Sequence, residues 1–213
     1  LGSGADWFEC TEFRRQKRGP RVMAVRDEPD GVTVVSCDVA PAYPDSLGIR
    51  RYDRHFIHIR PDLWIVVDYF STRAPATFDI LFHAHDERNA ADRPFAPCGG
   101  SAWETGGQKG RMRLTCLTPG MAGAYELQTV LGTGKKDGGD HPNHQSCLLR
   151  FRNTAPARTL TSVVVMEAFP AGGSATATAS WDGRTLTVKL GLRTWTLVRR
   201  GRGFRVCCSR GSD

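Results

Sequence analysis

The sequence lacks any long apolar run and any helical apolar pattern. No stretch approaches the ~20 consecutive apolar residues that a transmembrane helix needs, and the most apolar window, Leu63–Phe70, is interrupted by Asp68. Residues 1–7 carry neither the basic nor the apolar region of a signal peptide. No window of about a dozen residues has apolar side chains at a 3.6-residue spacing. We therefore expect little helix and no membrane partner.

The sequence also lacks the common catalytic and cofactor motifs. There is no Gly-x-Ser-x-Gly elbow and no dinucleotide fingerprint. Gly132–Lys136 has neither the spacing nor the strand-to-helix context of a phosphate-binding loop. No Cys-x-x-Cys motif is present, and the seven cysteines are an odd number that excludes complete internal pairing. We expect buried free thiols and no cofactor.

Short segments rich in β-branched and aromatic residues recur along the chain instead. Leu186, Val188 and Leu190 alternate with Thr185, Thr187 and Lys189, the period-two pattern of a half-buried strand. Pro61-Asp62 and Asp182-Gly183 are turn signals between such segments. The pattern predicts an all-β, antiparallel β-sandwich of two stacked sheets. The expected strands span residues 31–39, 55–60, 63–70, 77–85, 111–117, 125–131, 145–151, 159–166, 175–181, 184–190, 195–199 and 204–207.

The net charge of +7 is concentrated near the two ends of the chain. Residues 14–26 and 193–210 each hold six basic residues and no carboxylate, and the remaining 17 basic residues are outnumbered by 22 acidic ones. We divide the chain into a basic N-terminal segment, 1–30, and a β-sandwich domain, 31–213. The simplest interpretation of the charge is a solvated, arginine-rich surface. If it binds a partner, arginine forks suit the carboxylates and sulfates of an acidic polysaccharide. Nucleic acid is less favoured because no interleaved aromatic residues accompany the charge.

Two histidine pairs and several tryptophans are the remaining candidates for a site. His83 and His85 share a strand face, and His141 and His144 lie in the glycine-rich loop that follows Leu131. Neither pair has a predictable third ligand, so we predict no metal site. We expect Trp181 and Trp195 in the core, whereas Trp103, between glycine-rich loops, is the best candidate for an exposed platform that binds sugar.

A series of segments resembles the C-terminal β-sandwich part of the heparinase II/III family of polysaccharide lyases, over about residues 30–200. An arginine-bearing strand precedes a strand that ends in Val-Val-Asp, and a strand that ends in histidine follows it. A late strand ending in proline and a terminal hairpin complete the likeness. The segments are Ala42-Tyr43, 49–56, 61–68, 77–83, 160–170, Asp182-Gly183 and the strand around Trp195.

The resemblance implies a role in β-elimination on glycans that contain uronic acid. It implies that the sandwich supports the active-site cleft, with Arg50, Arg51, Arg54 and Trp103 near an acidic polysaccharide. The same arginines are also explained by structural ion pairs. In the family, a helical toroid domain supplies a catalytic tyrosine and histidine, so that domain is the implied partner and this chain alone is expected to be inactive.

No catalytic or metal residue is transferred to this sequence. The family's His-x-His-Ala-Asp motif has no counterpart in residues 1–30, which contain no histidine, and His83-Ala84-His85-Asp86 follows the Val-Val-Asp strand instead of preceding it. The resemblance implies a periplasmic or secreted location. Two alternatives remain open: a stand-alone module that binds anionic carbohydrate, and, ranked last, a nucleic-acid-binding β domain.

Overall fold

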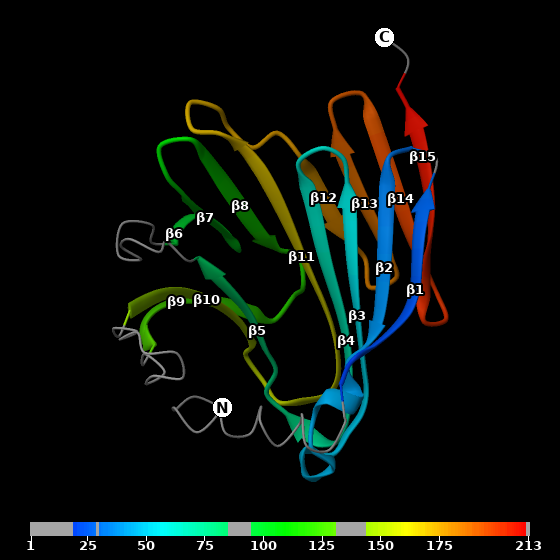
Figure 1. The fold of residues 1–213 in the computed structure, drawn as a ribbon. Coiled ribbons are helices and arrows are strands. Elements are labelled where there is room, and N and C mark those ends of the chain that lie inside the picture. Colours follow the sequence, from blue (N-terminus) through cyan, green and yellow to red (C-terminus); the bar gives the residue numbers. More distant parts are fainter. Residues whose placement is uncertain (1–18, 29, 85–94, 131–143, 212–213) are drawn as a thin grey trace, which may run out of the picture.

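The chain forms an all-β structure, as predicted (Figure 1). The computed structural model describes residues 19–28, 30–84, 95–130 and 144–211. These residues include two 3-10 turns, η1 (Ala40–Ala42) and η2 (Asp45–Leu47), and no helix long and apolar enough to cross a membrane. The strands are β1 (Arg21–Glu28), β2 (Val32–Asp38), β3 (Ile49–Ile59), β4 (Leu63–Ala76), β5 (Asp79–Ala84), β6 (Ala96–Gly99), β7 (Ala102–Gly106), β8 (Gly110–Cys116), β9 (Met121–Val130), β10 (His144–Asn153), β11 (Ala157–Pro170), β12 (Thr178–Trp181), β13 (Thr185–Leu190), β14 (Arg193–Arg200) and β15 (Gly203–Arg210).

The strands form three antiparallel sheets. Sheet A has the order β1-β2-β3-β4-β11-β8-β7-β6, sheet B the order β5-β10-β9, and sheet C the order β12-β13-β14-β15. Sheet C lies against one face of sheet A, and sheet B lies against the other face, toward the opposite end of the strand order (Figure 1). The sandwich is therefore confirmed, with a third sheet in addition to the two expected.

Three consecutive valines in β11 show how sheet A serves two cores. Val163 and Val165 pack against sheet C, in a core that includes Leu186, Trp195 and Leu197. Val164 points the other way, into a second core with residues of sheet B. Successive side chains of a strand alternate between faces, so a continuous apolar run requires cover on both sides of the sheet.

The sequence missed three strands of sheet A, two of them at its edges. These are β1, β6 and β7. Arg21–Glu28 had been placed in the basic N-terminal segment, but as β1 they pair with β2 and belong to the sheet. Edge strands are paired on one side only, and their side chains need not alternate between apolar and polar. β1 is exposed along most of its length, so periodicity gave no signal there.

The expectation of buried free thiols is only partly met. All six cysteines that the structure describes are free, but only Cys116 and Cys147 are buried. Cys98 and Cys207 are exposed. Trp195 is buried and Trp181 packs against the core between sheets A and C, as expected.

A polar junction joins sheet A to sheet C at one end of their shared core. The Asp53 carboxylate is fully buried and accepts hydrogen bonds from Arg51 Nε at 2.5 Å and from Arg202 Nε, in the β14–β15 turn, at 3.0 Å. Beside it, buried His55 shares a 2.8 Å hydrogen bond with Ser36 and meets Phe204 of β15 edge to face. Burial lowers the pKa of His55 from 6.5 to about 4.

We expect this junction to make the fold acid-sensitive. Because the folded state lowers the pKa of His55, the unfolded chain takes up a proton first as the pH falls. The stability that the neutral imidazole contributes is complete above pH 6.5 and is lost toward pH 4, by about 2–3 kcal/mol. Urea denaturation at intervals between pH 7 and 4 should show this loss, and His55→Gln should reduce it. Equal slopes for both proteins would contradict this role of His55.

Candidate functional site

Among the described residues, nothing covers part of the face of sheet A opposite sheet C, over β1–β4. In β3, Ile57 and Ile59 point into the core with sheet C, so Phe56 and His58 point to the other side. Phe56 remains 39% exposed and Trp64 of β4 41% exposed. We call this surface the open face; its residues are Val22, Val25, Val35, Arg54, Phe56, His58, Trp64 and Asp68.

The open face carries a flat aromatic pair near the β3–β4 turn. The rings of His58 and Trp64 stack with centroids 3.8 Å apart and planes 5° apart. His58 Nε2 lies 3.0 Å from the carbonyl oxygen of Pro61. Since a carbonyl only accepts, Nε2 is the protonated nitrogen and the ring is held in place. A rigid, exposed aromatic surface of this kind suits the apolar face of a sugar ring.

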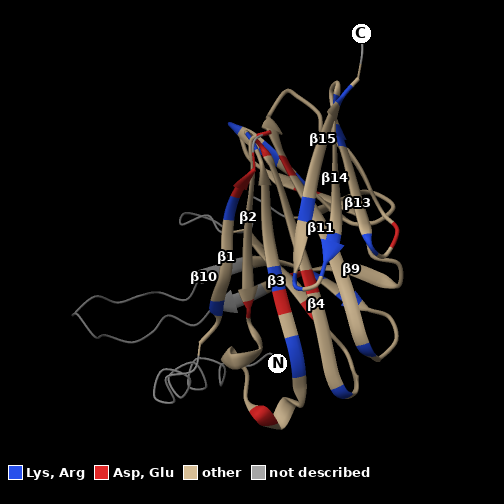
Figure 2. Ribbon diagram, turned by 90° about the vertical axis from the view of Figure 1, so that its right-hand side faces the viewer, with Lys and Arg blue, Asp and Glu red and all other residues tan. Residues whose placement is uncertain are grey.

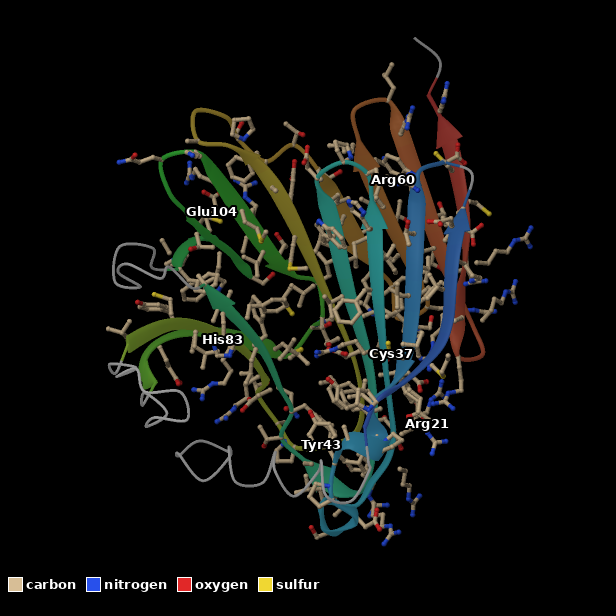
Figure 3. The ribbon with its side chains drawn as sticks, in the orientation of Figure 1. Arg21, Cys37, Tyr43, Arg60, His83 and Glu104 are labelled. Carbon is tan, nitrogen blue, oxygen red and sulfur yellow. The ribbon has the colours of Figure 1, made fainter. Side chains whose placement is uncertain are left out.

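A pocket of about 740 Å³ continues the open face toward sheet B. Met166 of β11 lies directly opposite Trp64 in the strand register and lines the pocket. The wall is mainly apolar, and His83 and Lys109 add polar groups to it (His83 is labelled in Figure 3). Ligand pockets typically have volumes of this order and combine apolar walls with a few polar groups. The other principal lining residues are Phe82, Phe95, Met112, Leu114 and Phe169.

A buried ion pair lies on the same face, separated from the aromatic pair by Phe56 and Val66. Arg54 donates two hydrogen bonds to the carboxylate of Asp68, at 2.6 and 2.9 Å, and Asp68 has no exposed side-chain surface. Burial raises the pKa of Asp68, while hydrogen bonds from Arg54 and Tyr52 oppose that rise. The Arg54 guanidinium lies 5.5 Å from the ring centre of Tyr52 and 5.9 Å from that of Phe56. The charge of Arg54 is therefore compensated and its orientation fixed.

The structure does not bring the four predicted binding residues together. Arg54 points to the open face, whereas Arg51 points to the other face and pairs with Asp53 at the junction with sheet C. Arg50 is exposed at an irregularity in the pairing of β3 with β4. Trp103 lies in β7, packed against the second core, where its indole nitrogen is so close to Gly123 that an added Cβ would lie 2.4 Å away. Trp103 is thus no exposed platform.

The histidine pairs fall largely outside the described residues. One histidine of each pair, His85 and His141, lies outside the described residues, so the structure gives the geometry of neither pair. Within the described part of the chain, no three residues among His, Cys, Asp and Glu gather as a metal site would require.

Sequence reasoning missed the aromatic pair because both faces of β3 and β4 are apolar in this region. Phe56 and Trp64 alternate with Ile57 and Ile65, so the exposed and buried positions look alike in the sequence. One available signal was the position of Arg54 and Asp68 on the same alternating face as Phe56 and Trp64.

Removal of Arg54 should destabilise the fold strongly. Arg54→Ala leaves the buried carboxylate of Asp68 without its counter-ion, and we expect a loss of about 3–5 kcal/mol in the free energy of unfolding. The exposed Arg50→Ala is the matched control and should change it by less than about 0.5 kcal/mol. The double variant Arg54→Met with Asp68→Leu should recover most of the loss. Urea unfolding measures all three, and equal effects of the two single variants would refute a structural role for the pair.

Several solved structures of other proteins are similar to this fold. No protein-family model matches the chain, and no curated protein matches its sequence. Among solved structures, heparan sulfate lyase HepC from Pedobacter heparinus is similar with a TM-score of 0.59 at 11% identity, over 99% of this chain and 33% of that one. The heparinase III-BT4657 gene product with methylated lysines is similar with a TM-score of 0.55 at 12% identity, over 90% of this chain and 27% of that one. A further heparinase III structure has a TM-score of 0.54 at 8% identity. The chain therefore shares the fold of a segment that makes up about one third of the length of these structures. The expected resemblance is confirmed at the level of fold.

Proposed function

We propose that the chain is the C-terminal β-sandwich of a heparinase II/III-like polysaccharide lyase. In this proposal it supports the cleft in which a helical toroid domain carries out β-elimination on a glycan that contains uronic acid. The observation that carries the proposal is the open face. It combines exposed apolar and aromatic side chains with an adjoining pocket, on the side of sheet A that sheet C does not cover. Contiguous apolar exposure of this kind marks an interaction surface.

The chemistry of the open face fits support better than catalysis. β-Elimination needs a base at C5 of the uronic acid, an acid at the leaving oxygen and a group that neutralises the carboxylate. Arg54 is already compensated by Asp68, and burial raises the pKa of Tyr52 well above its usual range. His58 is held by Trp64 and Pro61. We therefore assign the proton transfers to the toroid domain. From the likeness to the heparinase structures we also infer a periplasmic or secreted location.

The proposal is tested on the natural gene product that contains this chain. We expect it to include a helical region before the sandwich and to convert heparan sulfate or a polyuronate to unsaturated uronides, followed by their ultraviolet absorbance. The 213-residue chain alone should give no turnover. Turnover by the chain alone, or a gene product without a helical region, would overturn the proposal.

A stand-alone module that binds anionic carbohydrate is the second candidate function. The exposed His58–Trp64 pair favours it, because a planar aromatic surface can bind a sugar without any other domain.

Substitution of Trp64 tests direct binding by the open face. If the isolated chain binds sugar there, Trp64→Ala should weaken its affinity for heparan sulfate oligosaccharides by about fivefold to tenfold, because roughly 1 kcal/mol of aromatic contact is lost. Leu81→Ala, at a position 48% exposed on β5 of sheet B, is the control and should leave the affinity unchanged. Isothermal titration calorimetry measures both, and an unchanged affinity for Trp64→Ala would argue against the module.

A further inference from the structure

The outer face of sheet C carries a regular array of hydroxyl and basic side chains. Leu186, Val188, Leu197 and Phe204 are buried against sheet A, so the alternate positions of β13, β14 and β15 point outward. Thr178 and Ser180 extend the array onto β12. The outward residues are Thr178, Ser180, Thr185, Thr187, Lys189, Thr194, Thr196, Val198, Arg200, Arg205, Cys207 and Ser209.

Sheet C has almost no negative charge of its own. Residues 178–210 contain eight Lys and Arg but a single carboxylate, Asp182. Asp182 lies in the β12–β13 turn and accepts hydrogen bonds from the backbone N–H groups of Arg184 and Thr185, at 2.8 and 2.6 Å. Arg199 and Arg202 are engaged at the junction with sheet A, by Tyr69 and by Asp53.

The other six basic residues of the sheet have no such partner. Among the described residues, no carboxylate lies within ion-pair distance of any of them. Three belong to the outer face: Lys189, Arg200 and Arg205. Three lie at its margins: Arg184, Arg193 and Arg210.

Two arginines from the other end of the sequence, Arg21 and Arg26 of β1, lie on the same side of the molecule. Arg26 of β1 donates a hydrogen bond to the backbone carbonyl of Phe204 in β15 at 2.5 Å. The first strand of sheet A is therefore next to the last strand of sheet C, and blue segments mark both strands in Figure 2. Arg21 and Arg26 are exposed and extend the basic surface beyond the edge of sheet C. Two segments that are far apart in sequence thus combine their charge.

We propose that the outer face of sheet C binds an extended acidic polysaccharide, at a site separate from the open face. Guanidinium groups form paired hydrogen bonds with carboxylates and sulfates, and neighbouring threonine and serine hydroxyls can donate to the same oxygens or to sugar hydroxyls. Strands about 4.8 Å apart repeat these donors across a flat surface. The ligand class rests on the proposed function, and the surface itself rests on the charge and geometry of sheet C.

Nucleic acid fits this surface less well. Binding of a single strand uses aromatic side chains on which bases stack, and the aromatic residues of sheet C face sheet A: Trp195 and Phe204 are buried and Trp181 packs against the same core.

In the proposed lyase, a second site on the same molecule would hold a long substrate chain and raise its effective concentration at the cleft.

Charge removal on the outer face tests the inference. The test variant replaces its three basic residues: Lys189→Gln, Arg200→Gln and Arg205→Gln. The control variant removes the same charge from exposed positions on other sheets: Arg73→Gln, Arg152→Gln and Arg158→Gln. Binding of the 213-residue chain to heparan sulfate and to polygalacturonate is measured by surface plasmon resonance at two salt concentrations. We expect roughly tenfold weaker binding for the test variant and less than twofold for the control, with the difference shrinking at high salt.

Three further measurements complete the test: thermal unfolding, binding by the Trp64→Ala variant, and binding of duplex DNA. Thermal unfolding should give the same midpoint for both charge variants, since the replaced side chains are exposed. If Trp64→Ala abolishes binding while the test variant binds normally, the inference is overturned and the proposed function stands. If only the test variant loses affinity, the surface is established whether or not the open face binds sugar. Equally tight binding of duplex DNA, lost in the same variant, would overturn the polysaccharide assignment.

Discussion

The structure depends on a central sheet that is apolar on both faces. Val163, Val164 and Val165 show the constraint within one strand, because neighbouring side chains must be buried on opposite sides. Sheet C covers one face, and sheet B covers only part of the other. The uncovered part retains Phe56 and Trp64, which a sheet with one polar face would not present there. The open face is thus a consequence of the way the core is divided.

Most strands were predictable from sequence, whereas β1, β6, β7 and the site were not. Alternating residues such as Leu186 and Val188 carry the signal directly. β1 is exposed along most of its length and gains its place through backbone pairing with β2, which periodicity does not report. The aromatic pair depends on which of two apolar faces is covered, and that is decided by the distant sheets B and C.

Arg51 and Arg54 show why a cluster in sequence is a poor guide to a site. They are three positions apart in one strand, so they point to opposite faces. Arg51 pairs with Asp53 at the junction with sheet C, and Arg54 pairs with Asp68 on the open face. Each arginine compensates a buried carboxylate, so the structural alternative left open by the sequence holds for both. Sheet C, by contrast, carries six basic residues that have no carboxylate partner among the described residues.

This distribution separates two kinds of chemistry on one small domain. The open face has apolar and aromatic surface with its charge internally compensated, which suits a close, desolvated contact with another domain or a sugar ring. The outer face of sheet C has uncompensated charge and hydroxyls on a flat, wet surface, which suits loose contact with a long anion. A compensated pair would not attract a polyanion from a distance, and exposed arginines would be costly in a dry interface. The two faces are therefore suited to different steps: capture of a chain on the outer face of sheet C and its positioning at the open face.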